Sequence, residues 1–435
     1  MSGARVSRRT LIGSVFGAAL AAGVGGLGGC SPGSSGPSSP GSTGPLRFTF
    51  WGPTFYQEFT KKMVEAFTSK SGVQVGLEPT EWSGYWDKLA TQTAAGDEPD
   101  VINMDGKYLA EYGGRGALAD LEAAAGLDLS GLSRSDLDAG RLNGKLYAAS
   151  TGSNAFAVLA NPTLFKQGGV ELPDDRTWTW DDYAKIGEQL SRDDVVGISG
   201  GGTYADLTIF LRQHGEDLFS GDGVGYRNET LAAWFKGFLD RQTSGASLSA
   251  PASVEDGSAT LEQQAFATNK AAMTWMWTNQ LESVRTATGH DDIALLRPPS
   301  VNGAAKENGL FLKASMYWSI SARSKRAEQA AQLVNFLLND PDAAKIQLCN
   351  RGVPSDPEML AAMAGGLTAT DKDVIGFLEE VTPEISPTPP GVQPVGASDS
   401  QNTITRYLSE VRFGRLSPAD AAAKTTDEIK AMIAA

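Results

Sequence analysis

One stretch of the sequence fits a serine-hydrolase motif. Gly197-Ile198-Ser199-Gly200-Gly201 follows the G-x-S-x-G pattern, which places a nucleophilic serine on a sharp turn after a strand. Glycines continue through Gly202 before a helix can begin, and a chain with 50 glycines meets this pattern by chance. The general base would have to be His214 or His290, and neither lies in a recognisable motif. A hydrolase is therefore the lesser alternative.

Paired carboxylates are a second source of chemistry. Asp174-Asp175 and Asp181-Asp182 offer the two acids that a glycosidase needs on either side of a sugar bond. Neighbouring acids at a turn or a helix start more often cap backbone N–H groups, so these pairs give little support for catalysis. Two histidines and one spare cysteine do not readily close a zinc site, and we expect no metal. Gly52-Pro53-Thr54 is no phosphate-binding glycine loop, and we expect no cofactor.

Cys30 is the third reactive group. It ends the run Leu27-Gly28-Gly29-Cys30, which resembles the lipobox of bacterial lipoproteins, where the cysteine thiol is lipidated and becomes the first residue of the mature chain. Three arginines and a weakly apolar, Gly- and Ala-rich run precede it, as in a signal peptide. The pair Arg8-Arg9 resembles a twin-arginine export signal, and an ordinary Sec signal remains the alternative. We expect residues 1–29 to be a signal peptide and lipidated Cys30 to hold the protein at the outer face of the cytoplasmic membrane.

The next residues and the overall charge fit an exported protein. Residues 31–45 contain only Ser, Pro, Gly and Thr, so segment 30–45 is expected to be a lipidated cysteine with a flexible tether. Loss of residues 1–29 removes three arginines and no acid, which moves the net charge from −14 to −17. Such a charge disfavours nucleic acid as a partner. Once Cys30 is lipidated, Cys349 has no disulfide partner and is expected to be a small buried residue.

The body that must position any site begins with alternating strands and helices. Apolar spacing predicts strands near 46–50, 73–77 and 100–105, separated by helices over 54–71 and 85–95, which indicates an α/β domain with a parallel sheet. Further helices are predicted over 178–191, 204–214, 229–240, 259–268 and 326–339. Asp340-Pro341 is a cap followed by a first-position proline and predicts another helix start.

Motifs in these segments resemble the bacterial extracellular solute-binding family, which includes maltose-binding protein and many ABC sugar receptors. The resemblance covers roughly residues 46–355, and Asn269 stands where the family usually has Gly. Its motifs are Phe50-Trp51, Ser71 to Val75, Ala94 to Val101, Thr177 to Tyr183, Phe266 to Met273, Ile320 to Lys325 and Gly352-Val353-Pro354. It implies a two-lobed, periplasmic-binding-protein-like (type II) α/β fold with a hinge and a ligand cleft between the lobes. Lobe 1 would comprise 46–153 and 292–340, and lobe 2 would comprise 154–291 and 341–435.

Candidate binding residues follow from what a sugar requires. Pyranose rings have apolar faces and a rim of hydroxyls, so a sugar site needs flat aromatic side chains with polar groups beside them. Asp105 is a candidate because it follows the third strand, and open α/β sheets bind ligands at the carboxyl ends of their strands. The ligand-binding candidates are Trp51, Glu81, Trp82, Tyr85, Asp105, Asn154, Trp275, Trp277, Asn279, Tyr317, Trp318 and Arg351.

The resemblance implies a protein that is not an enzyme. The function it implies is that of an extracytoplasmic substrate-binding lipoprotein of an ABC importer. Such a protein binds a carbohydrate, here expected to be an oligosaccharide, and delivers it to the transmembrane subunits of the permease. The first alternative is the same fold binding a polyamine or a peptide, since an acidic chain suits a cationic ligand.

Overall fold

The computed structural model describes residues 44–434 except 53, 222, 387 and 392. The predicted signal peptide, Cys30 and nearly all of the predicted tether lie outside these residues. Within 44–434, none of the helices is both long enough and apolar enough to cross a membrane.

The first sheet has the strand order β2-β1-β3-β14-β6. β1 pairs in parallel with β2 and β3, whereas β14 is antiparallel to β3 and β6. Helices α1 (Thr54–Ser71) and α2 (Trp82–Ala95) connect the parallel strands, as the apolar spacing predicts. The strands are β1 (Leu46–Trp51), β2 (Val75–Thr80), β3 (Val101–Met104), β6 (Ala149–Ser150) and β14 (Tyr317–Ile320).

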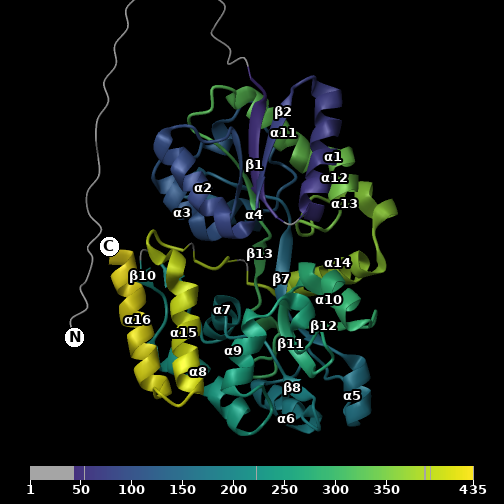
Figure 1. The fold of residues 1–435 in the computed structure, drawn as a ribbon, viewed down its shortest axis with the longest axis vertical. Coiled ribbons are helices and arrows are strands. Elements are labelled where there is room, and N and C mark those ends of the chain that lie inside the picture. The colour runs from purple at the N-terminus through teal and green to yellow at the C-terminus, as the bar shows by residue number, and fades with distance from the viewer. Residues whose placement is uncertain (1–43, 53, 222, 387, 392, 435) are drawn as a thin grey trace, which may run out of the picture. The chain divides into compact units, whose positions relative to one another are not determined.

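Helices cover both faces of this sheet (Figure 1). Phe48 and Trp318 pack with α1, α11 (Ala327–Asn339) and α12 (Pro341–Gln347). Trp51 and Tyr317 pack instead with α2 and α3 (Gly106–Gly114). Successive residues of a strand point to opposite faces, so Tyr317 and its neighbour Trp318 belong to different cores.

The second sheet has the order β12-β7-β11-β8, and β13 also pairs with β7. β11 is antiparallel to β7 and parallel to β8. Its strands are β7 (Ser153–Ala160), β8 (Val196–Ile198), β11 (Ala271–Trp277), β12 (Ala294–Leu296) and β13 (Leu312–Ala314). Its core includes side chains from α5 (Pro162–Gly168), α6 (Trp180–Leu190), α7 (Tyr204–Arg212), α10 (Leu281–Thr288) and α14 (Ala369–Val381).

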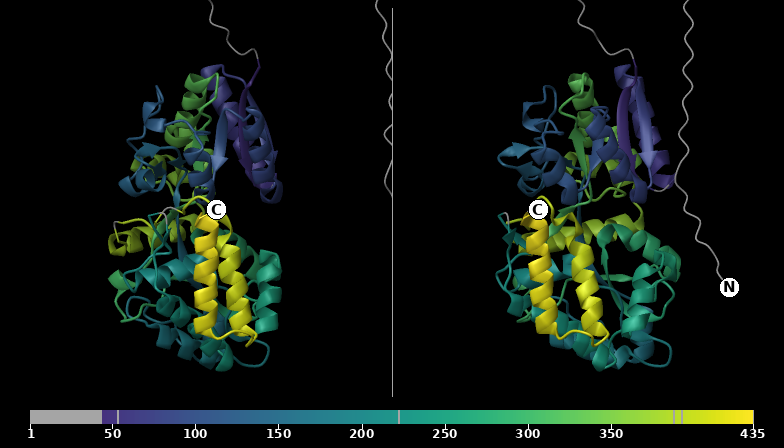
Figure 2. Two further views of the ribbon diagram at one scale, coloured as in Figure 1. Left: turned by 90° about the vertical axis from the view of Figure 1, so that its left-hand side faces the viewer. Right: turned by 60° about the vertical axis from the view of Figure 1, so that its left-hand side comes forward.

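A separate apolar cluster joins the C-terminal helices to the middle of the chain. α15 (Ser400–Arg412) and α16 (Pro418–Ala434) form a hairpin that packs on α8 (Asn228–Thr243), as Figure 2 shows. The remaining elements are short: α4 (Arg134–Ala139), α9 (Ala250–Ser258), α13 (Pro357–Met363), β4 (Arg141–Leu142), β5 (Lys145–Leu146), β9 (Phe219–Ser220) and β10 (Gly223–Val224).

The chain passes between the two sheets at β6–β7, at β13–β14 and after α12, and the three crossing segments are hydrogen-bonded to one another. The Thr151 N–H donates to the Met316 carbonyl (3.0 Å), and the Ser315 N–H donates to the Gly152 carbonyl (2.8 Å). Ser153 and Val353 exchange both backbone hydrogen bonds, at 2.9 and 3.0 Å. Residues 151–153 are therefore the central crossing segment.

Glycine is required where two of these segments meet. Gly152 and Gly352 have φ angles of 144° and 88°, which L side chains rarely adopt. A Cβ atom on Gly152 would lie 2.6 Å from the carbonyl carbon of Gly352, and a Cβ on Gly352 would lie 2.6 Å from that of Gly152. The crossing segments can approach this closely only because both residues lack a side chain.

Most of the predicted elements are present. α6 begins with a capping box between Thr179 and Asp182, and Asp340 caps α12 with Pro341 at its first position. The predicted helix over 259–268 is wrong, because only a short 3₁₀ turn forms there, at Leu261–Gln263. The Ala265 N–H donates to the Asp256 carboxylate (2.6 Å) instead of continuing a helical ladder.

Strand pairing differs from the predicted lobe boundaries. β12 and β13 lie beside β7, so the chain rejoins the first sheet at β14 and not near Asp292. α12 packs on α1 and α11, which associates residues 341–347 with the first sheet. We propose that lobe 1 comprises 46–150 with 317–347, and that lobe 2 comprises 153–314 with 354–434. The predicted boundaries were carried over from the family resemblance and not from the local pattern, which explains the difference.

Candidate functional site

An ion pair joins the two sheets at the end of β3. Asp105 caps α3 by accepting the Lys107 backbone N–H at 3.0 Å. Its other carboxylate oxygen lies 3.6 Å from the Nζ atom of Lys313, which belongs to β13 and therefore to the second sheet. Asp105 thus occupies the carboxyl end of a strand, as predicted, and contacts the opposite lobe.

Lys313 also contacts aromatic side chains of lobe 2. Its Nζ lies 5.4 Å from the centroid of the Trp277 ring, and its ammonium interacts electrostatically with the Tyr204 side chain at the start of α7. Burial opposes the charged form, but attraction to Asp105 and to the two tyrosines Tyr204 and Tyr317 outweighs it, so the pKa of Lys313 is raised. Lys313 is therefore a fixed positive charge between the two lobes.

In lobe 1, aromatic rings gather around the start of α2. Trp51 lies edge-on to Trp82 at 5.2 Å, and Trp86 stacks on Tyr108 with 3.7 Å between ring centroids. Trp82 is 40% exposed, whereas Trp51 is nearly buried. The Lys107 Nζ lies 4.8 Å from the centroids of both Trp82 and Tyr108. This cluster presents one open tryptophan face beside a lysine.

In lobe 2, four rings form a row across β7, β11 and α6. Trp180 stacks on Trp275 at 5.9 Å, Trp275 stacks on Phe156 at 5.7 Å, and Phe156 contacts Trp277 at 5.0 Å. The inner ring, Trp275, is buried and donates its Nε1–H to the Tyr183 hydroxyl (3.0 Å). The outer rings, Trp180 and Trp277, are half-buried.

Two predicted site residues belong to the core of lobe 1, which corrects the sequence-based assignment. Trp318 is completely buried, 5.4 Å from Phe48, on the face of the sheet opposite Asp105. Arg351 is also completely buried, and its guanidinium lies 4.7 Å from the Phe59 ring and 4.8 Å from the Trp318 ring. Alternation along β14 excludes Trp318 from the site.

The remaining candidates divide by exposure. Tyr85 is buried and donates its hydroxyl to the Asn103 carbonyl (2.6 Å). Its ring packs edge-on against the Trp51 ring within the core of lobe 1. Asn154 and Tyr317 are buried close to the Asp105–Lys313 pair. Asn154 is the cross-strand neighbour of Lys313 in the β7–β13 ladder. Burial raises the pKa of the Tyr317 hydroxyl, and attraction to the Lys313 ammonium opposes that rise. Glu81 and Asn279 are exposed, at the start of α2 and just after β11.

Sequence reasoning missed several residues that the fold brings to this junction. Lys313 and Tyr204 meet Asp105 and Trp277 only through the sheet crossing, and no local pattern marks them. Lys107 and Trp180 carried a usable signal: Lys107 follows Asp105 by two residues, and Trp180 begins a predicted helix. The missed residues are Trp86, Lys107, Tyr108, Trp180, Tyr204 and Lys313.

The candidate nucleophile and bases have the following surroundings. Ser199 is buried, and its hydroxyl has no hydrogen-bond partner among residues 44–434. His214 contacts the Phe210 carbonyl of its own helix through Nδ1 (2.8 Å). Burial raises the pKa of the free Cys349 thiol, which lies in the core of lobe 2. In the described part of the chain, no group of three or more His, Cys, Asp or Glu side chains could hold a metal ion.

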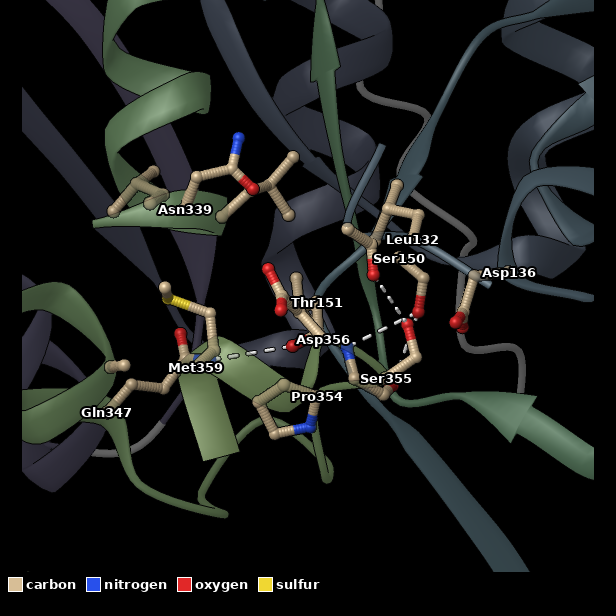
Figure 3. A pocket seen from close by; sticks show the side chains of 15 residues that line it. Leu132, Asp136, Ser150, Thr151, Asn339, Gln347, Pro354, Ser355, Asp356 and Met359 are labelled. Atoms are coloured by element: carbon tan, nitrogen blue, oxygen red, sulfur yellow. Dashed lines mark hydrogen bonds between the residues drawn. The ribbon is translucent and has the colours of Figure 1, made fainter. Parts of the chain in front are cut away.

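A pocket lies at the crossing segments (Figure 3). Asp136 and Gln347 line opposite sides of it, with Thr151 between them. The Asp136 carboxylate accepts the Ser133 and Ser153 hydroxyls at 2.6 and 3.1 Å, and the Gln347 amide contacts the Thr151 carbonyl at 3.5 Å. None of the lining residues is aromatic, so the pocket belongs to the hinge and not to the tryptophan site.

Comparison with known proteins agrees with this architecture. A maltooligosaccharide ABC transporter solute-binding lipoprotein of Streptococcus pneumoniae is 23% identical over 210 residues, which are 44% of this chain and 48% of that protein. The match therefore spans about half the length of that relative. An uncharacterized lipoprotein of Streptomyces antibioticus is 22% identical over 360 residues, which are 79% of this chain and 78% of its own.

The fold is also that of solved solute-binding proteins. A periplasmic oligogalacturonide binding protein from Yersinia enterocolitica superposes with a TM-score of 0.77 at 21% identity, over 90% of this chain and 98% of that protein. The two-lobed type II fold expected from the sequence is thereby confirmed. The pattern of one family, described as bacterial extracellular solute-binding protein, matches residues 53–344. The chain therefore belongs to the bacterial extracellular solute-binding protein family.

Proposed function

We propose that this protein is an extracytoplasmic substrate-binding lipoprotein that binds an oligosaccharide between its lobes and delivers it to the permease of an ABC importer. The observation that carries the proposal is the set of side chains around the Asp105–Lys313 ion pair. Trp82 approaches this region from lobe 1, and Trp277 approaches it from lobe 2.

The side chains match the chemistry of a sugar. The apolar face of a pyranose stacks on an indole ring, and Trp82, Trp180 and Trp277 are partly exposed indoles of the candidate site. The hydroxyl rim needs charged or polar partners, which Asp105 and Lys313 provide. Because these groups come from two lobes, a bound sugar would favour closure of the hinge.

Binding of saccharides tests the carbohydrate part. The full chain, purified in mild detergent, is titrated with mono- and oligosaccharides while its tryptophan fluorescence is followed. A saturable response is expected, with Trp277→Ala weakening it at least roughly ten-fold. Trp234→Phe is the matched control, because Trp234 is buried in the separate cluster under the C-terminal hairpin. A response to amino acids, peptides or polyamines, with none to sugars, would refute the carbohydrate assignment.

The lipoprotein part rests on Cys30 and on the segments before and after it. A thiol at this position takes lipid, and two or more acyl chains make a stable anchor. In the native host, the protein is expected in the membrane fraction and Cys30→Ser in the soluble exported fraction. If both proteins fractionate alike, the anchor is not Cys30.

A further inference from the structure

Trp82 and Trp277, two partly exposed tryptophans of the site, each have a lysine ammonium over the ring. The Lys107 Nζ lies 4.8 Å from the Trp82 centroid, and the Lys313 Nζ lies 5.4 Å from the Trp277 centroid. The two tryptophans belong to different lobes, so the arrangement occurs on both sides of the site. A ligand that stacks on either ring must therefore meet a positive charge.

The Asp105 carboxylate contacts both lysines, but in different ways. Asp105 pairs with Lys313 through its side chain but contacts only the backbone N–H of Lys107. Among residues 44–434, no carboxylate lies within ion-pair distance of the Lys107 ammonium, and the carboxylates of Asp105 and Asp399 attract it only from farther away. Burial lowers the pKa of Lys107, and repulsion from Lys313 acts in the same direction. Of the two ammonium groups, that of Lys107 is thus the one without an ion-pair partner among the described residues.

We propose that this site selects carbohydrates that carry a carboxylate, with an acidic sugar ring stacked on Trp82 and its carboxylate paired with Lys107. The inference rests on the proposed function, since it names the class of sugar that the same site binds.

The geometry explains why an acidic sugar fits better than a neutral one. The ammonium of Lys107 occupies the faces of Trp82 and Tyr108, and a sugar must displace it to stack there. A neutral sugar removes these cation–π contacts and leaves the charge without a partner. The carboxylate of a uronic acid projects from the ring edge, where the flexible lysine stem can follow it and form a charge-assisted hydrogen bond.

The same charges disfavour cationic ligands. The chain as a whole carries a net charge of −14, which suits a polyamine or a basic peptide. Lys107 and Lys313 reverse that preference locally, because like charges in a half-buried site repel more strongly than they do in water. A cationic ligand at the Trp82 and Trp277 rings therefore meets two lysine ammonium groups, of which one is paired with Asp105.

Calorimetric titration of the full chain in mild detergent tests the inference. The probes are uronate disaccharides of several linkages (α-1,4-digalacturonate, β-1,4-dimannuronate and a glucuronate-containing disaccharide), each compared with its neutral methyl ester, and maltotriose. At least one acid is expected to bind roughly ten-fold or more tightly than its ester, since a charge-assisted bond is replaced by a neutral contact. Raised salt should weaken the acid and not the ester.

Variants separate the role of Lys107 from a general effect of charge. Lys107→Met is expected to bind the acid no better than the ester, while Lys107→Arg keeps the preference. Lys61→Met is the matched control, because Lys61 is an exposed lysine of the same lobe paired only with Glu65. If a neutral sugar binds as tightly as every acid, or if Lys107→Met keeps the preference, the inference is wrong and the carbohydrate receptor stands. If no saccharide binds at all, the proposed function itself fails.

Discussion

Gly152 and Gly352 meet backbone to backbone where the chain crosses between the two lobes, and neither position has space for a Cβ atom. Each belongs to a different crossing segment, and the segments are joined by the reciprocal hydrogen bonds of Ser153 and Val353. Bending between the lobes must occur at or beside this contact, since the sheets on either side are rigid by comparison. The fold and the expected motion thus depend on the same pair of glycines.

Replacement of Gly352 by alanine is expected to destabilise the protein by about 2–4 kcal/mol, because a strained φ angle and a steric overlap add together. Gly289→Ala is the matched control: Gly289 also has a positive φ angle (72°), but nothing lies within 4 Å of its added Cβ. The control should lose only about 1 kcal/mol. Urea denaturation followed by circular dichroism measures both, and equal losses would show that the close contact is unimportant.

Trp82 and Trp318 should respond in opposite ways to substitution by alanine. Trp82→Ala is expected to cost less than about 1.5 kcal/mol of stability, because the ring is 40% exposed, but to weaken ligand binding at least roughly ten-fold. Trp318→Ala is expected to cost about 3–5 kcal/mol, because it opens a cavity in the core of lobe 1. Denaturation and titration of both variants check the pair. Strong binding by Trp82→Ala would remove Trp82 from the site.

Arg351 should tolerate methionine better than alanine. Its guanidinium donates to the Thr60 hydroxyl (2.9 Å), while Nε and Nη1 have no hydrogen-bond partner among residues 44–434. Burial lowers the pKa of Arg351 to about 9, so the folded protein disfavours the charge. Arg351→Met keeps the volume and should change the free energy of unfolding by less than about 1 kcal/mol, whereas Arg351→Ala should lose about 3 kcal/mol.

Thermal unfolding of the two Arg351 variants distinguishes packing from charge. A methionine variant as unstable as the alanine variant would mean that the guanidinium itself holds the surrounding rings together. Ligand affinity should be unchanged in Arg351→Met, because the side chain lies in the core of lobe 1 and not beside Asp105.

The Glu78 carboxylate should make stability depend on pH. It accepts Arg47 Nε (2.7 Å) and Gln92 Nε2 (3.0 Å) and lies 3.2 Å from Lys88 Nζ. Burial opposes ionisation, but these partners outweigh it and hold the pKa of Glu78 below its ordinary value of 4.5. A pKa that is lower in the folded state stabilises the protein above pH 4.5, and this contribution is lost as the pH falls through the folded-state pKa.

Glu78→Gln should therefore cost about 1 kcal/mol at pH 7 and less than that at pH 3. Glu65→Gln serves as the control. The Glu65 carboxylate is largely exposed and lies 3.8 Å from the Lys61 Nζ, so its ion pair is weak. Urea denaturation at several pH values provides the measurement. A loss for Glu78→Gln that is the same at both pH values would show that the ionised carboxylate does not contribute.

Much of the fold could be predicted from the sequence because its signals are local. The alternation in β1, the capping box at Thr179 and the Asp340-Pro341 helix start each depend on residues within one turn or strand. The wrong helix over 259–268 shows the limit of such local signals. The Ala265 backbone N–H, which a helix would need for its own hydrogen bonds, donates instead to the Asp256 carboxylate.

The site was harder to predict because its contacts are distant in the sequence. Asp105 could be chosen from its place after a strand, but its partner Lys313 lies 208 residues farther along and reaches it only through the crossing at β13–β14. Arg351 was misplaced for the same reason, since a buried guanidinium depends on rings from β1, α1 and β14 that no local pattern brings together.

The order of strands in the first sheet has a consequence for synthesis and export. β14 lies between β3 and β6, yet it is made only after all the strands of the second sheet. Until Tyr317–Ile320 emerges, β3 has an unpaired edge and β6 has no partner in the sheet. A nascent or truncated chain that ends before β14 would therefore expose an unpaired strand edge. The N-terminal lobe cannot finish folding until all the strands of the second sheet have been made.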